Sequence, residues 1–175
     1  HYFPAGGSLF GSEAEVGYQY AGKEYVGRNE HVSGFDTCDE CHDTHALEVM
    51  YEECGDCHDG VSSAEDLEAI RVSETDFDGN GDVTEGLAAE IATMREALLV
   101  AMQAYADGIE GVSPIVYDSH AYPYFFDDAG ERYATWTPSL LRAAYNYQYA
   151  TKDPGGFAHN GLYVIQTLYD SLEDV

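Results

Sequence analysis

The chain has 175 residues, 45% hydrophobic and 13% aromatic, so it can build a folded core and does not have the composition of a disordered protein. Thirty-three acidic residues against seven Lys and Arg give a formal net charge of -26, which repels phosphate backbones and excludes nucleic acid as a partner. No run of roughly 18 apolar residues occurs, so we expect no membrane-spanning segment, and a start at His1 without an apolar leader fits a secreted chain whose signal peptide has been removed.

Residues 1–37 are rich in Gly and Tyr and lack sustained periodicity, which predicts extended segments or loops. The four cysteines of the chain follow in two copies of one motif, Cys38-Asp-Glu-Cys41-His42 and Cys54-Gly-Asp-Cys57-His58. C-x-x-C-H is the attachment signature of c-type haem, because two thiols bond to one edge of the porphyrin and the adjacent His reaches the iron. The pattern therefore predicts two haems (heme c), attached through the four cysteines, with His42 and His58 as proximal ligands.

Other uses of four cysteines explain the pattern less well. A four-cysteine zinc site or two structural disulfides would fit the number and spacing of the thiols. Neither requires a His directly after both second cysteines. A thioredoxin-like pair would need a βαβ context that the flanking residues do not supply.

The sixth ligand of each iron is normally His or Met. Met94 and Met102 lie on an apolar helical stripe and are interpreted as core, whereas Met50 follows the first motif closely and stays open. His residues outnumber Met residues, so we expect bis-His coordination at both irons.

His31 lies seven residues before Cys38, and His45 lies three residues after His42, giving C-x-x-C-H-x-x-H. Over residues 31–58 this arrangement resembles the bacterial multihaem c-type cytochromes, and a looser similarity extends through the tail, from Ala-Ala-Tyr-Asn-Tyr-Gln-Tyr to Tyr-Asp-Ser-Leu-Glu. The resemblance implies distal ligands from an upstream His or from the His just after a motif. His31 and His45 are the first choices, and the alternatives are His120, His159 and His1. The chain departs from the family by carrying only two haems for its size.

Residues 76–85, Asp-Phe-Asp-Gly-Asn-Gly-Asp-Val-Thr-Glu, match the opening of a calcium loop. Alternating oxygen ligands wrap a hard cation there, and Gly81 permits the sharp turn. The twelfth position should be Glu and is Leu87, with Glu85 two residues early and Glu90 three residues late. We expect a structural calcium ion in a shortened loop, the alternative being an acidic turn without metal. The expected ligands are Asp76, Asp78, Asn80, Asp82 and Glu85.

Helical patterns fill much of the remaining chain. Ser63 predicts the start of a short helix over 63–72, and apolar residues at intervals of three and four predict a helix over about 86–106. Thr137 followed by Pro138 predicts a helix to about 151, and Asn160 predicts the cap of a last helix. The expected fold is mainly α with extensive irregular loops. It combines a small dihaem core with a helical C-terminal part. The expected division is an N-terminal, dihaem-binding region over 1–62 and a helical region over 63–175, together one compact unit.

If imidazole fills both axial positions of each iron, no substrate reaches the metal and only the electron moves. The sequence thus predicts a non-enzymatic dihaem cytochrome, extracellular or periplasmic, that relays electrons between redox protein partners. The surplus His residues raise a further hypothesis, in which like subunits assemble into a conductive extracellular filament, a homopolymer. The alternative is a dihaem peroxidase or nitrogen-oxide reductase with one open iron.

Overall fold

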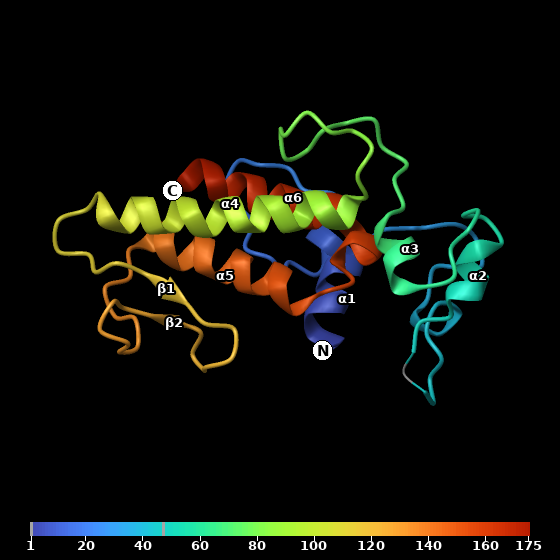
Figure 1. Cartoon of the computed structure of the whole chain (residues 1–175), viewed down its shortest axis with the longest axis horizontal. Coiled ribbons are helices and arrows are strands. Elements are labelled where there is room, and N and C mark those ends of the chain that lie inside the picture. Colours follow the sequence, from blue (N-terminus) through green and yellow to red (C-terminus); the bar gives the residue numbers. More distant parts are fainter. Residues whose placement is uncertain (1, 47) are drawn as a thin grey trace.

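Three long helices form the centre of the molecule: α4 (Leu87–Asp107), α5 (Pro138–Lys152) and α6 (Gly156–Asp174). In this computed structural model, which describes residues 2–46 and 48–175, α4 packs against both α5 and α6 (Figure 1). Their contact surfaces bury apolar side chains completely, which is the main force that holds such helices together. The fully buried side chains include Leu98, Met102, Leu140, Tyr163 and Leu168. The fold is mainly α with long irregular connections, as the sequence predicts.

The helix ends follow the sequence signals. The Thr137 hydroxyl accepts a hydrogen bond from the backbone N–H of Leu140 at 3.1 Å, and Pro138 is the first residue of α5. Ser63 caps α3 (Ala64–Glu68) by accepting from the N–H of Asp66 at 3.3 Å. Helix α4 ends at Asp107, close to the predicted end at about 106, and Gly108 is its C-cap.

Helix α6 bends at Asn160, where φ is -170° and ψ is 78°, an extended conformation inside the helix. The Asn160 side chain accepts from the N–H of Tyr163 at 3.2 Å and so caps the longer second part, as predicted. Its amide group donates to the Gly27 carbonyl at 2.9 Å. The extra turn over 156–159 was not predicted, and the bend sets the direction of His159 at its end.

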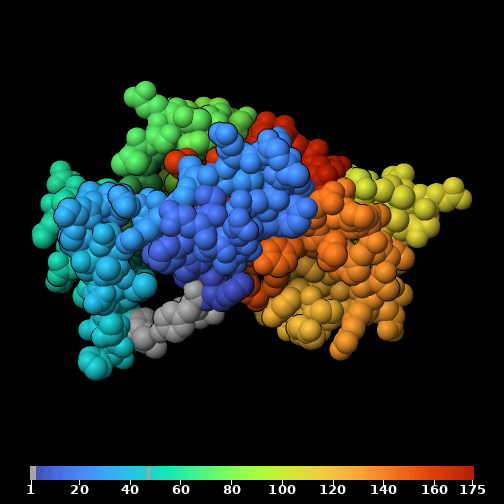
Figure 2. Space-filling view, turned by 180° about the vertical axis from the view of Figure 1, so that it is seen from behind, coloured from blue at the N-terminus to red at the C-terminus, as the bar shows by residue number. Residues whose placement is uncertain are grey.

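The N-terminal segment lies across the helical body (Figure 2). It contains α1 (Tyr2–Phe10) and the 3₁₀ turn η1 (Gly11–Glu13), although the sequence predicted loops or extended chain there. Helix α1 packs against α6, and the Ser8 hydroxyl lies 2.8 Å from the Tyr149 hydroxyl. Gly7 lies so close to Val16 that a Cβ at Gly7 would approach the Val16 side chain to 2.4 Å. Tertiary packing thus stabilises a helix whose glycines disfavour it locally.

Residues 31–62, here called the cysteine lobe, extend from one end of the body (Figure 1). The lobe contains the 3₁₀ turn η2 (Cys38–Glu40) and α2 (Tyr51–Gly55), joined by loops. Among its described residues only Val61 is buried. The lobe therefore has almost no apolar core of its own.

Strands β1 (Val116–Tyr117) and β2 (Phe125–Phe126) pair antiparallel, with Val116 opposite Phe126. This short hairpin lies beneath α4 and α5, on the side of the molecule away from the cysteine lobe (Figure 1). Within the described residues, no helix has both the length and the apolar character needed to cross a membrane.

Candidate functional site

Both cysteine motifs fold into the same tight turn. The backbone N–H of His42 donates to the Cys38 carbonyl at 2.9 Å, and the N–H of His58 donates to the Cys54 carbonyl at 2.8 Å. Each turn carries two thiols and one imidazole on five consecutive residues, which is the set that c-type haem attachment requires. Two separate segments thus adopt one local structure.

The two motifs lie next to each other in the lobe. His42 and Val49 form an antiparallel bridge, and the N–H of Met50 donates to the Cys41 carbonyl at 2.9 Å. Burial raises the pKa of the Cys41 thiol, and the neighbouring Cys54 raises this pKa further. None of the four cysteines, all of which are described, forms a disulfide. All four thiols are therefore free of other covalent bonds.

Each motif histidine faces a histidine from a distant segment. The ring centres of His31 and His58 lie 6.0 Å apart, and those of His42 and His159 lie 6.3 Å apart. An imidazole nitrogen binds a metal at about 2 Å, so two imidazoles on opposite sides of one metal have ring centres about 6 Å apart. Both pairs have the spacing that two axial ligands of one iron would show.

The pairing crosses over in the sequence. His31 precedes the first motif but faces the histidine of the second, His58. His159, which lies in α6 of the helical body, faces the histidine of the first motif, His42. The first pair lies entirely within the lobe, and the second joins the lobe to the helical body.

Three neighbouring residues fix the position of His159. Its Nδ1 atom lies 2.8 Å and 3.0 Å from the two carboxylate oxygens of Asp153, whose side chain is only 2% exposed. A Cβ at Gly155 would approach the imidazole Cε1 atom to 2.9 Å, so the ring needs a glycine there. The Asn29 amide donates to the His159 carbonyl at 2.9 Å. Because Nδ1 is hydrogen-bonded to Asp153, Nε2 is the imidazole nitrogen that can bind a metal.

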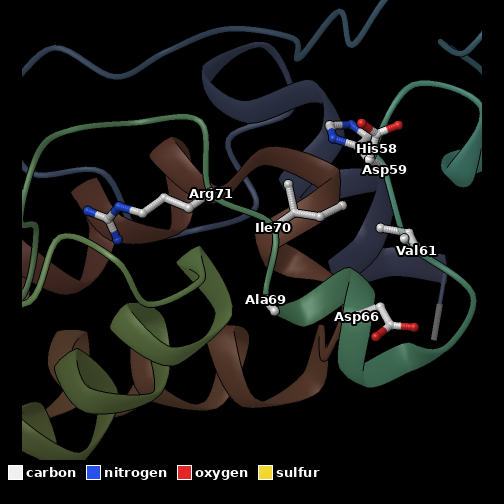
Figure 3. Close-up of a pocket in the computed structure, with 8 residues that line it drawn as sticks. His58, Asp59, Val61, Asp66, Ala69, Ile70 and Arg71 are labelled. Atoms are coloured by element: carbon white, nitrogen blue, oxygen red, sulfur yellow. The ribbon is translucent and has the colours of Figure 1, made fainter.

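The surroundings of the other pair are more open. His31 is exposed, and His58 lines a shallow pocket with Asp59, Asp66 and Arg71 (Figure 3). The Arg71 side chain points away from His58 in this view. No side chain in the described part of the chain forms a hydrogen bond with either imidazole of this pair.

The remaining histidines lie elsewhere. His45 is exposed in the lobe, and among the described residues no aromatic ring faces its imidazole as His58 faces His31. His120 lies in the β1–β2 connection, where its 94% exposed side chain is 3.6 Å from Asp118. His1 is outside the described residues. Sequence reasoning ranked His159 as an alternative and missed Asp153 and Gly155, although both lie in the Asp-Pro-Gly-Gly break before α6.

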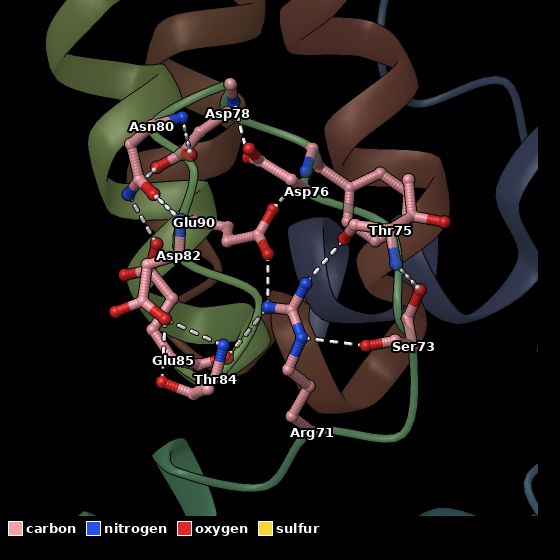
Figure 4. Close-up of polar contacts among 12 residues, drawn as sticks. Arg71, Ser73, Thr75, Asp76, Asp78, Asn80, Asp82, Thr84, Glu85 and Glu90 are labelled. Carbon is pink, nitrogen blue, oxygen red and sulfur yellow. Dashed lines mark hydrogen bonds and ion pairs between the residues drawn. The ribbon is translucent and has the colours of Figure 1, made fainter.

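In the acidic loop over 76–85, side-chain carboxylates accept hydrogen bonds from backbone N–H groups of the same loop (Figure 4). The Asp76 carboxylate accepts from the N–H groups of Gly79 and Gly81, and the Asn80 amide donates to Glu85 at 2.5 Å. Hydrogen bonds to the charged form lower the pKa of Asp76 and Asp82.

Glu90, and not the expected Glu85, lies beside the carboxylates of Asp76 and Asp78. Asp76, Asp78 and the fully buried Glu90 bring one oxygen each to within 4.8 Å of one another. The Arg71 guanidinium contacts Glu90 and also donates to the carbonyls of Ser73, Thr75 and Glu85 (Figure 4). Among the described residues, no comparable cluster joins the cysteines and histidines of the lobe, so the geometry gives no support to a four-cysteine zinc site.

Two C-x-x-C-H turns, each beside a facing pair of imidazoles, define a candidate site for two c-type haems. The chain is similar over 99% of its length to the C-type polyheme cytochrome OmcB of Geobacter sulfurreducens, with 25% identity over 208 residues in both strain KN400 and strain PCA. It is 23% identical over 206 residues, again 99% of the chain, to the C-type polyheme cytochrome OmcC of strain PCA. The aligned part is 26% of OmcB and 25% of OmcC, so the chain spans about a quarter of the length of these relatives.

These similarities support a place in the multihaem c-type cytochromes and haem c as the cofactor. No family model and no solved structure matches the chain.

Proposed function

We propose that this chain is a dihaem c-type cytochrome that relays electrons between redox partners outside the cytoplasm. The observation that carries the proposal is the pair of facing imidazoles at each motif, with ring centres 6.0 Å and 6.3 Å apart. Bound haem supplies one-electron chemistry at its iron. The similarity to polyhaem cytochromes along the whole chain supports the same function.

In this proposal each haem is held by one motif and two histidines. Cys38 and Cys41 attach the first haem, with His42 and His159 as axial ligands. Cys54 and Cys57 attach the second, with His58 and His31 as axial ligands. His159 thus takes the place for which the resemblance favoured His45, because among the described residues His159, and not His45, faces a motif histidine.

Two imidazoles at each iron leave no open position for peroxide or a nitrogen oxide, which argues against the enzyme alternative. They also leave no axial position that a neighbouring subunit would have to fill. Assembly into a filament would then depend on contacts other than exchanged histidines. The net charge of -26 favours redox partners that present a basic surface.

Location outside the cytoplasm agrees with the cysteine content. Four cysteines in two close pairs would form disulfides in an oxidising compartment unless another bond occupied the sulfurs. Thioether attachment of haem occupies all four. The proposal therefore accounts for every cysteine of the chain.

Carbon monoxide binding to the reduced protein tests the ligand assignment. The wild-type protein should carry two haems by mass spectrometry and bind no carbon monoxide, whereas His159→Ala should bind one molecule per chain. His45→Ala is the matched control and should bind none. Stoichiometric binding by the wild-type protein, or a site opened by His45→Ala and not by His159→Ala, would contradict the proposal.

We also propose that the acidic loop binds one calcium ion, with Glu90 rather than Glu85 beside Asp76 and Asp78. Five carboxylates lie on this loop and at the start of α4, and one of them, that of Glu90, forms an ion pair with a guanidinium. A divalent cation would offset the repulsion among the others. The carboxylates belong to Asp76, Asp78, Asp82, Glu85 and Glu90, and the guanidinium belongs to Arg71.

Thermal unfolding with calcium and with a chelator tests this site. Calcium should raise the melting temperature of the wild-type protein and of Glu85→Gln, and should have no effect on Glu90→Gln or Asp78→Asn. The last variant changes a carboxylate that is only partly buried, so it is expected to fold. Equal melting temperatures of the wild-type protein with and without calcium would rule the site out.

A further inference from the structure

A buried carboxylate lies beside one of the two histidine pairs and not beside the other. Asp153 is bonded to Nδ1 of His159, while no described side chain forms a hydrogen bond with the imidazole of His31 or His58. The Asp153 side chain is 2% exposed, and the His159 side chain is 26% exposed. The first-motif pair therefore includes a negative charge shielded from water, which the second-motif pair lacks.

The carboxylate has one polar partner among the described residues. His159 Nδ1 lies within 3.0 Å of both oxygens, and no Lys or Arg forms an ion pair with Asp153. A buried carboxylate is costly unless a positive charge lies close by. A histidine bonded to a metal through Nε2 and to a carboxylate through Nδ1–H satisfies this requirement, because the metal supplies the positive charge.

The backbone around His159 leaves the ring little freedom. Any side chain at Gly155 would bring its Cβ within 2.9 Å of the imidazole Cε1 atom, and Asn29 holds the His159 carbonyl at 2.9 Å. The bend at Asn160 then turns the following helix away. The ring is thus confined between Asp153, Gly155 and the first motif.

We propose that Asp153 is a positioning residue that holds His159 as an electron-rich axial ligand and makes the first-motif haem the lower-potential haem of the two. This inference rests on the proposed function. By accepting a hydrogen bond from Nδ1–H, the carboxylate raises the basicity of the imidazole, and a buried negative charge would favour the more positive, oxidised iron. When one electron is shared, the first-motif iron is oxidised and the second-motif iron is reduced. The electron then resides on the haem beside His31 and His58.

Spectroelectrochemical titration of the holoprotein tests this assignment. The wild-type protein should show two one-electron steps. Asp153→Asn keeps a hydrogen-bond acceptor and removes the charge. It should therefore raise the reduction potential of the lower step by at least about 59 mV, which is a tenfold change in the equilibrium constant for one electron. The upper step should move less than threefold, and both haems should keep their low-spin spectra.

Two further variants distinguish the hydrogen bond between His159 and Asp153 from the effect of any nearby negative charge. Asp59→Asn removes an exposed carboxylate next to His58 that forms no hydrogen bond with an imidazole, and it should shift either step less than threefold, because exposed charges are screened. If Asp153→Asn loses the low-spin signature of one haem, Asp153→Glu should restore it.

An unchanged lower step, a shift confined to the upper step, or equal shifts of both steps in Asp153→Asn would overturn the inference. So would a lost low-spin signature that Asp153→Glu does not restore. Failure of the proposed function would be visible separately, as carbon monoxide binding by the wild-type protein.

Discussion

The helical body and the cysteine lobe are stabilised in different ways. The body buries a continuous apolar core between α4, α5 and α6, whereas Val61 is the only buried residue among the described residues of the lobe. A segment of about 30 residues cannot bury enough apolar surface to fold alone, and such segments depend on covalent or metal links. The comparison teaches that the body carries its own core, whereas under the proposed function the haems would have to serve as the core of the lobe.

Removal of haem should give the largest effect and would test this comparison directly. With all four cysteines changed to Ser, the lobe should lose its fixed structure while α4, α5 and α6 stay folded. Amide hydrogen exchange should then show unprotected amides over 31–62 and protected amides in the three helices. Protected amides throughout the lobe of this variant would break the comparison.

A cavity in the helical core should destabilise the body and leave the lobe unchanged. Leu98→Ala removes a fully buried side chain and should lower the free energy of unfolding of the body by about 2–5 kcal/mol. The two reduction potentials should not change, because Leu98 lies in α4 and outside the lobe. Leu141→Ala, at a side chain that is 55% exposed, is the control and should cost less than about 1 kcal/mol in a denaturant titration.

High pH should have a smaller effect and destabilise the fold through one buried and one partly buried tyrosine. Burial raises the pKa of Tyr149 and of Tyr25 above the ordinary value of about 10, so both stay neutral in the folded chain. The unfolded chain loses these protons first as the pH rises. Stability is therefore complete below about pH 10 and decreases above it.

Circular dichroism against denaturant at pH 9 and at pH 11 measures this decrease. Tyr149→Phe cannot ionise at this position, so it should lose less stability between the two pH values than the wild-type protein. An equal loss in both proteins would exclude Tyr149 as a source of the effect.

The sequence predicted features that depend on residues close together in the chain. The cysteine motifs and the caps at Ser63 and Thr137 are local patterns with a direct chemical reason, and the structure confirms those caps. Helix α1 was missed because its glycines and its Pro have low helix propensity, and packing against α6 decides its conformation.

The partner of each motif histidine could not be derived in this way. His45 was favoured because the resemblance to multihaem cytochromes implies a ligand just after a motif, whereas the histidine that faces His42 lies 117 positions further along the chain. That contact depends on how the lobe docks on α6 and on the bend at Asn160. The same holds for Glu90, which lies beside Asp76 and Asp78 because of the course of the chain from the acidic loop into α4.

The crossed pairing of the histidines has a consequence for the order of folding. His31 and His58 are 27 positions apart, whereas His42 and His159 are 117 positions apart. Closing the longer loop costs about 1 kcal/mol more in chain entropy. The pair at the second motif is therefore expected to come together first, and the pair at the first motif only after α6 has folded.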